Sequence, residues 1–125
     1  MRRVCRDRGG PGTPLLLLHG LAGHSGEWEA TARRLSARYR VVAFDQRGHG
    51  ASERHPPDVS RAAYVQDAVS VIDQLGLRRP VVVGQSLGGH TGPLPFASRE
   101  AAAGVPRGRT GRCGVGGWPG RARRC

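Results

Sequence analysis

Short runs of apolar residues alternate along this chain with longer segments in which apolar residues recur every three or four positions. The runs lie at residues 15–18, 40–44 and 80–84, and proline, glycine or polar residues bound each of them. Apolar runs of this length without polar alternation are typical of strands buried on both faces of a sheet. A shorter strand is expected at residues 4–6, before a glycine-rich turn.

Two of the intervening segments have helical spacing. In residues 27–38, Trp28, Ala32 and Leu35 fall on one stripe and the arginines lie off it. In residues 58–75, Ser60 is a suitable N-cap. The apolar positions expected to face the core there are Val65, Ala68, Val69, Ile72 and Leu75. The alternation of strands and helices predicts an α/β fold, with a parallel sheet flanked by helices and joined by right-handed crossovers.

This patterning stops after residue 92. Residues 93–125 contain 7 glycines, 7 arginines, 5 alanines, 4 prolines and a single acidic residue. We therefore divide the chain into a patterned domain, residues 1–92, and an irregular Arg/Gly/Pro-rich C-terminal tail, residues 93–125, which is expected to be disordered. The formal net charge is +11, it comes from arginine alone, and more than half of it lies in the tail.

Composition excludes several classes of protein. Cysteines at positions 5, 113 and 125 form no C-x-x-C pair, which argues against a zinc ribbon or a thioredoxin-like motif, and an odd count is a poor disulfide framework. The longest apolar run is far shorter than the ~20 residues that span a membrane. The sequence after Met1 lacks the apolar stretch of a secretory signal. We expect a cytoplasmic protein without a membrane segment.

The candidate chemistry lies where the expected strands end, since ligands bind at the carboxyl ends of parallel strands. Residues 84–88, Gly-Gln-Ser-Leu-Gly, fit the G-x-S-x-G nucleophile elbow, a sharp turn from strand to helix. Such a turn holds Ser86 in a strained conformation with its hydroxyl exposed. The absence of a Cβ at Gly84 and Gly88 lets strand and helix approach closely. An incidental serine in a glycine-rich turn is the alternative.

Two backbone N–H groups are candidates to bind an oxyanion. The N–H of Leu87 lies at the start of the expected helix, aimed where negative charge would develop. The turn at His19-Gly20 would present the N–H of Leu21 as a second donor. The glycine-rich and polar segment 45–52, which follows the second run, is expected to shape the site without taking part in chemistry.

Residues 15–20, 44–52 and 81–89 together resemble the α/β-hydrolase fold family, in its order and at about its spacing. The resemblance covers residues 4–91. It implies that Ser86 is the nucleophile and that the N–H groups of Leu21 and Leu87 form the oxyanion hole. It also implies a small-molecule ester or related carbonyl substrate, an acyl-enzyme intermediate, and neither a cofactor nor a metal. A serine here fits the esterase, lipase, carbon–carbon bond hydrolase and cofactor-free haloperoxidase branches better than the dehalogenases and epoxide hydrolases.

The remaining catalytic groups have no match. In this family a carboxylate and then a histidine follow the serine along the chain. After Ser86 the chain offers only His90, one turn along the same helix, and Glu100. His24 and His49 precede the serine and could line the site without matching the family's base. We therefore expect the 125-residue chain to be a nearly inactive, truncated or frameshifted member of the family.

The tail admits three interpretations. Its composition favours out-of-frame translation of a GC-rich gene, and a genuine extension is the second interpretation. The third is an alternative function, in which a non-catalytic basic protein binds nucleic acid through the arginines; this is favoured least, because the segment lacks lysine and regular repeats. The strand at residues 81–83 is expected to form an exposed apolar edge prone to self-association.

Overall fold

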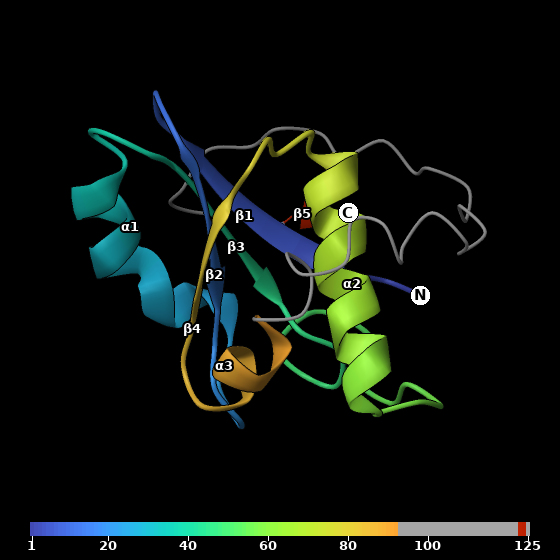
Figure 1. Ribbon diagram of the computed structural model, residues 1–125. Coiled ribbons are helices and arrows are strands. Elements are labelled where there is room, and N and C mark those ends of the chain that lie inside the picture. Colours follow the sequence, from blue (N-terminus) through green and yellow to red (C-terminus); the bar gives the residue numbers. More distant parts are fainter. Residues whose placement is uncertain (93–122, 125) are drawn as a thin grey trace.

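A single mixed sheet organises the chain in the computed structural model, which describes residues 1–92 and 123–124 (Figure 1). The strand order is β4-β2-β3-β1-β5. The expected disorder of the tail concerns residues that fall almost entirely outside this described part. The strands are β1 (Val4–Gly9), β2 (Pro14–Leu18), β3 (Arg40–Asp45), β4 (Val81–Gly84) and the two-residue β5 (Arg123–Arg124).

The three strands predicted from apolar runs are parallel, but the sheet is not uniformly so. Strand β2 pairs in parallel with both β3 and β4, whereas β1 runs antiparallel to β3. The parallel arrangement expected for the three apolar runs is confirmed, and β1, for which the sequence predicted no direction, adds an antiparallel strand. Only residues 10–13 separate β1 from β2, which is far too short for the crossover that parallel strands require. Strand β1 also extends to Gly9, beyond the expected residue 6.

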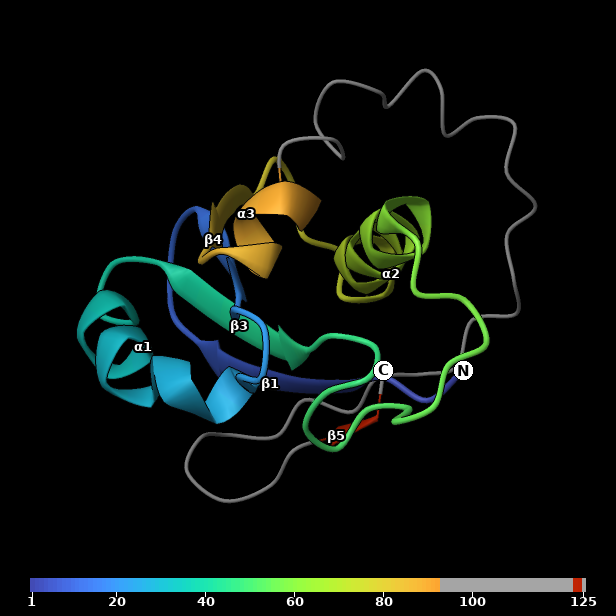
Figure 2. The same cartoon turned by 90° about the horizontal axis from the view of Figure 1, so that it is seen from below.

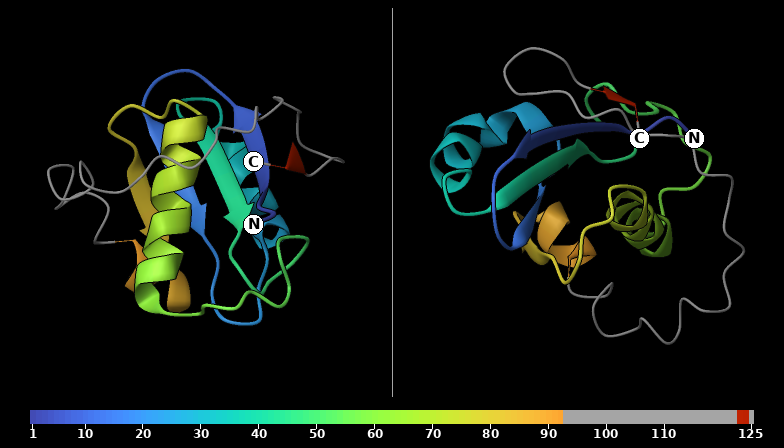
Figure 3. Two further views of the ribbon diagram at one scale, coloured as in Figure 1. Left: turned by 90° about the vertical axis from the view of Figure 1, so that its right-hand side faces the viewer. Right: turned by 90° about the horizontal axis from the view of Figure 1, so that it is seen from above.

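Helices cover both faces of this sheet. Helix α1 (Glu29–Leu35) lies on one face, and α2 (Arg61–Gln74) with α3 (Leu87–Thr91) lies on the other (Figures 2 and 3). The helix expected at residues 27–38 is shorter, because a 3-10 turn, η1 (Ser25–Trp28), precedes α1. The hydroxyl of Ser60 accepts a hydrogen bond from the N–H of Ala63, which confirms Ser60 as the N-cap of α2.

The core is divided between the two faces by the alternation along the strands. Leu16 and Phe44 belong to the cluster that packs under α2, while Leu15 and Ala43 belong to the cluster under α1. Every residue from Leu15 to Leu18 and from Val41 to Phe44 is buried. Continuous apolar runs are therefore required here, because successive side chains enter different cores.

The buried face of α2 differs from the expected stripe. Ala68 is fully buried, but Val65 and Val69 are only half-buried, whereas Tyr64 and Asp67 are buried. Polar contacts with the loop after β3, described below, account for this difference. A prediction of the buried face that uses hydrophobicity alone does not include such residues.

Cys5 is buried in β1 and is disulfide-bonded, although three cysteines make a poor disulfide framework. No helix within residues 1–92 or 123–124 is long and apolar enough to cross a membrane.

Candidate active site

Ser86 occupies a sharp turn between β4 and α3. Its backbone angles are φ 51° and ψ −110°, a left-handed region that side-chain-bearing residues rarely adopt, and it is exposed. The two flanking glycines are sterically required. A Cβ on Gly84 would lie 2.3 Å from the carbonyl carbon of Gly88, and a Cβ on Gly88 would lie 2.3 Å from the carbonyl oxygen of Leu18. The local geometry is thus that of the expected strand–turn–helix elbow.

The turn after β2 lies against this elbow. A Cβ built on Gly20 would be 3.6 Å from the Cβ of Ser86, and the N–H of Gln85 donates to the carbonyl of Leu18 at 3.0 Å. Within the described residues, the N–H groups of Leu21 and Leu87 and the hydroxyl of Ser86 take part in no hydrogen bond. The three groups expected to act together therefore lie on neighbouring turns with their hydrogen-bonding capacity unused.

His19 is buried at the end of β2, where its ring holds the following turn through two hydrogen bonds. Its Nε2 accepts the N–H of Gln46 at 2.9 Å, so its Nδ1 carries the proton and donates to the carbonyl of Gly20 at 2.8 Å. Burial lowers the pKa of His19 below its ordinary value, and the neighbouring His49 acts in the same direction, against the hydrogen bond to Gly20. The imidazole is thus held neutral, and both of its nitrogens are occupied in shaping the turn.

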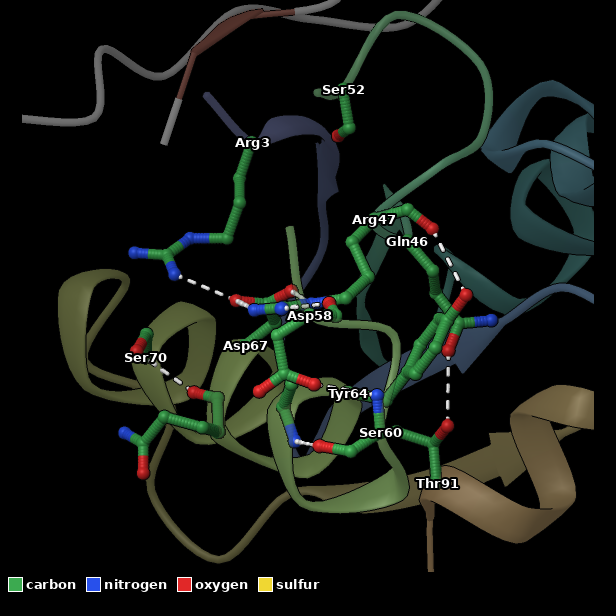
Figure 4. A network of polar contacts seen from close by, with 12 residues as sticks. Arg3, Gln46, Arg47, Ser52, Asp58, Ser60, Tyr64, Asp67, Ser70 and Thr91 are labelled. Atoms are coloured by element: carbon green, nitrogen blue, oxygen red, sulfur yellow. Dashed lines mark hydrogen bonds and ion pairs between the residues drawn. The ribbon is translucent and has the colours of Figure 1, made fainter. Parts of the chain in front are cut away.

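The side chain of Gln46 connects this turn to the elbow helix. Its Nε2 donates to the carbonyl of His19 at 2.7 Å, and its Oε1 lies 3.1 Å from the hydroxyl of Thr91 in α3 (Figure 4). Gln46 and Thr91 are each only 1% exposed. The ends of β2 and β3 and the last residue of α3 are therefore joined by one buried polar chain.

Asp45 fixes the loop that follows β3. Its Oδ1 accepts from both the N–H and the hydroxyl of Ser25, at 2.7 and 2.6 Å, and its Oδ2 accepts from the N–H of Ala51 at 2.9 Å. Burial opposes ionisation, but these hydrogen bonds and the charge of Arg6 hold the pKa of Asp45 below its ordinary value. With both oxygens occupied, Asp45 has a structural role, as expected for segment 45–52.

Arg47 anchors the same loop to α2. Its Nε and Nη2 bind the two carboxylate oxygens of Asp67 at 2.7 and 2.9 Å, and Arg3 adds a third contact at 2.9 Å (Figure 4). The hydroxyl of Tyr64 donates to the carbonyl of Arg47. These contacts explain why Asp67 and Tyr64 face inward on α2.

The remaining histidines do not complete a catalytic site. His24 is exposed and its Nδ1 caps η1 by accepting from the N–H of Gly26. The ring of His49 lies 5.0 Å from that of His19, and its Nδ1 contacts the carbonyl of Arg47. His90 is exposed on α3, and Glu100 lies outside the described residues. Within the described residues, no imidazole ring of these three histidines forms a hydrogen bond with the hydroxyl of Ser86, and His90 meets Ser86 only through its backbone N–H, which donates to the Ser86 carbonyl at 3.2 Å.

Among residues 1–92 and 123–124, no group of three or more histidine, cysteine, aspartate or glutamate side chains could hold a metal ion.

Sequence reasoning assigned no role to Gln46, Thr91 or Asp67. Gln46 stands inside a motif that was singled out, directly after a strand, and that position is the one signal that points to it. Thr91 is 45 positions from Gln46, and only the fold brings the two side chains together.

Comparison with known proteins places these features in context. The model of the alpha/beta hydrolase fold family matches residues 13–92. The chain is 41% identical over 79 residues to a putative carbamate hydrolase, RutD, of Caulobacter vibrioides, with 62% of this chain covered. It is 42% identical over 83 residues to a non-heme haloperoxidase of Rhodococcus erythropolis, with 64% covered. The crystal structure of the enol-lactonase from Burkholderia xenovorans LB400 superposes with a TM-score of 0.70 and 29% identity.

These relatives are much longer than the matched segment. The alignments span 29% of the carbamate hydrolase and 30% of the haloperoxidase, and the superposition covers 79% of this chain but 39% of the enol-lactonase.

Proposed function

This chain belongs to the α/β-hydrolase fold family, and from that premise we propose that it carries the nucleophile and oxyanion-binding half of a serine hydrolase. The observation that supports this most directly is the exposed Ser86 at φ 51° in a glycine-flanked elbow. The proposed substrate is a small ester or a related carbonyl compound. Relatives described as hydrolases support that substrate class.

The proposed reaction follows from the two turns. The Oγ of Ser86 attacks the carbonyl carbon of the substrate and forms a C–O bond, and its proton passes to a base. The carbonyl oxygen becomes an oxyanion that the N–H groups of Leu21 and Leu87 bind. Collapse of this intermediate expels the alcohol and leaves an acyl group on Ser86. Water then attacks the acyl carbon, which releases the acid and restores the serine hydroxyl.

The base is what the 125-residue chain lacks. Triad chemistry requires a histidine in contact with the serine and a carboxylate that orients it. His19 is neutral but buried, with both ring nitrogens engaged, and His90 makes no contact with the hydroxyl of Ser86. We therefore propose that the chain by itself is nearly inactive, because loss of the triad partners costs several orders of magnitude in rate.

A pair of assays tests this function. The purified 125-residue chain is expected to hydrolyse p-nitrophenyl acetate no faster than its Ser86→Ala variant. Residues 1–92 would also replace the matching segment of the Rhodococcus haloperoxidase, and the chimera is expected to hydrolyse the ester in a manner that Ser86→Ala abolishes. A folded chimera, verified by circular dichroism, whose activity survives Ser86→Ala would refute the assignment. Rapid turnover by the 125-residue chain that depends on Ser86 would refute the proposed inactivity.

The second candidate function is nucleic-acid binding, which the formal charge of +11 supports. Binding of a single-stranded oligonucleotide by the full chain should then weaken steeply as salt rises, and removal of residues 93–125 should abolish it. Equal binding by the full and shortened chains would exclude the tail as the binding element.

A further inference from the structure

We propose that Gln46 is a positioning residue that sets the placement of the two oxyanion-binding N–H groups, by linking the turn that carries Leu21 to the helix that carries Leu87. This inference rests on the proposed function of Ser86. It concerns a side chain that the proposed reaction does not use, and it stands on hydrogen-bond geometry.

The orientation of the Gln46 amide is unambiguous. The carbonyl oxygen of His19 can only accept, so the group 2.7 Å from it must be the NH₂ of Gln46. The opposite end of the amide is then the oxygen, which accepts from the hydroxyl of Thr91. The backbone N–H of Gln46 donates to Nε2 of His19. Gln46 thus makes two hydrogen bonds with His19 and one with Thr91.

Both ends of this link lie next to the candidate donors. His19 stands two residues before Leu21, and its Nδ1 is bound to the carbonyl of Gly20. On the other side, the hydroxyl of Thr91 also lies 3.1 Å from the carbonyl oxygen of Leu87. Because Thr91 has one hydroxyl proton and both oxygens can only accept, this proton is shared between Gln46 and Leu87 in a bifurcated hydrogen bond. Polar contacts therefore run from the turn carrying one N–H to the residue carrying the other.

An apolar or acidic side chain cannot replace this link. Methionine fills a similar volume but neither donates to His19 nor accepts from Thr91, so the buried carbonyl of His19 loses this donor and the hydroxyl of Thr91 keeps only the carbonyl of Leu87 as an acceptor. Glutamate would present a carboxylate oxygen to the carbonyl oxygen of His19. Gln46 is only 1% exposed, so bulk solvent does not reach its amide to replace these contacts.

The first measurement locates the two N–H groups directly. In the ¹⁵N-labelled full chain, the amide resonances of Leu21 and Leu87 are expected to shift in Gln46→Met. They should stay in place in Gln66→Met, which makes the same change at an exposed position of α2. Unchanged Leu21 and Leu87 resonances in a folded Gln46→Met would overturn the inference.

The second measurement separates positioning from mere support of the fold. A fluorophosphonate probe reacts with the Oγ of a serine. The O–P bond forms, the P–F bond breaks, fluoride leaves and the serine proton passes to solvent. The labelling rates are compared at a temperature where every variant is fully folded. The probe is expected to label Ser86 about 10- to 100-fold more slowly in Gln46→Met than in the wild type, because small misplacements of reacting groups lower reaction rates by factors of this order. Labelling at the wild-type rate would contradict the inference.

Thr91 provides a test that leaves Gln46 and its two hydrogen bonds with His19 unchanged. Thr91→Val, which keeps the side-chain shape, should slow labelling of Ser86, and Thr91→Ser, which keeps the hydroxyl, should preserve it. Equal rates for these two variants would overturn the inference even where Gln46→Met fails to fold. A wild-type chain that is not labelled at Ser86 would contradict the proposed function instead, and the amide resonances would still decide the placement by Gln46.

Discussion

At the scale of single residues, the elbow depends on two positions that have no room for a Cβ. We expect Gly84→Ala and Gly88→Ala each to destabilise the fold by about 1–3 kcal/mol, since the new atom would overlap backbone atoms that cannot move aside. Gly89→Ala is the matched control, because its Cβ would lie 3.6 Å from the nearest atom, an ordinary contact. Urea unfolding measures all three. Equal losses at positions 84, 88 and 89 would show that close approach is not the cause.

A second prediction at this scale concerns pH. The lowered pKa of His19 means that the unfolded chain binds a proton there at a higher pH than the folded chain does. Its contribution to stability is therefore complete above its ordinary pKa of about 6.5 and declines as the pH falls below that value. Asp45, whose pKa is lowered from the ordinary range of a carboxyl, remains ionised throughout this window and adds its own loss only at more acidic pH.

The free energy of unfolding at about pH 7.5 and about pH 5.5 tests this prediction. The loss on acidification should be smaller in His19→Gln than in the wild type. If His19→Gln loses as much stability as the wild type, His19 is not the group responsible.

Residue-scale prediction from the sequence succeeded where the backbone itself is distinctive. The steric need for Gly84 and Gly88 and the exposure of Ser86 follow from a local five-residue pattern, and the structure confirms them. The links from Gln46 to Thr91 and from Arg47 to Asp67 join distant positions. The periodicity of apolar residues carries no information about such pairs. The buried polar contacts could therefore be identified only from the three-dimensional structure.

At the scale of secondary structure, β4 is the most exposed of the strands β1 to β4. Among the described strands it pairs with β2 alone, and Val81 and Val83 are 51% and 40% exposed. Unpaired apolar edges favour association between chains. The net charge of +11 opposes association, and salt screens that repulsion. We therefore expect self-association that increases with ionic strength.

Sedimentation velocity of two charge-matched variants tests the role of this edge. Val83→Lys should reduce association, and Val59→Lys, which adds the same charge at an exposed position away from the sheet, should reduce it much less. Equal effects would assign the change to net charge and exclude the β4 edge as the contact.

The elements were predictable in proportion to how fully they are buried. Strands β2 and β3 enter two separate cores, so unbroken apolar runs identified them. No direction was predicted for β1, because its own residues do not encode one. The direction follows from the short connection through residues 10–13, which cannot form the crossover that parallel strands require. The inward face of α2 was misjudged because Asp67 and Tyr64 are buried by polar partners.

At the scale of the whole molecule, the described residues bring together one part of the proposed catalytic site. The elbow, the turn after β2 and the loop after β3 meet at one end of the sheet, braced by His19, Gln46 and Asp45. The matched segment makes up 29% of the carbamate hydrolase and 39% of the enol-lactonase, so most of each relative lies outside it. We propose that a complete enzyme of this type carries its catalytic histidine and carboxylate in the region outside this match. The nucleophile and the base would then lie on different segments of one protein.

The most direct test of this account is the site of reaction with a fluorophosphonate probe in the full 125-residue chain. The N–H groups of Leu21 and Leu87 are expected to stabilise the negative charge that develops on the phosphoryl oxygen of the probe, so Ser86 should react in preference to every other serine. Mass spectrometry after proteolysis is expected to find one adduct, on Ser86, that disappears in Ser86→Ala. Adducts spread over other serines, or equal labelling of Ser86→Ala, would contradict the assignment of Ser86 as a nucleophile beside a formed oxyanion hole.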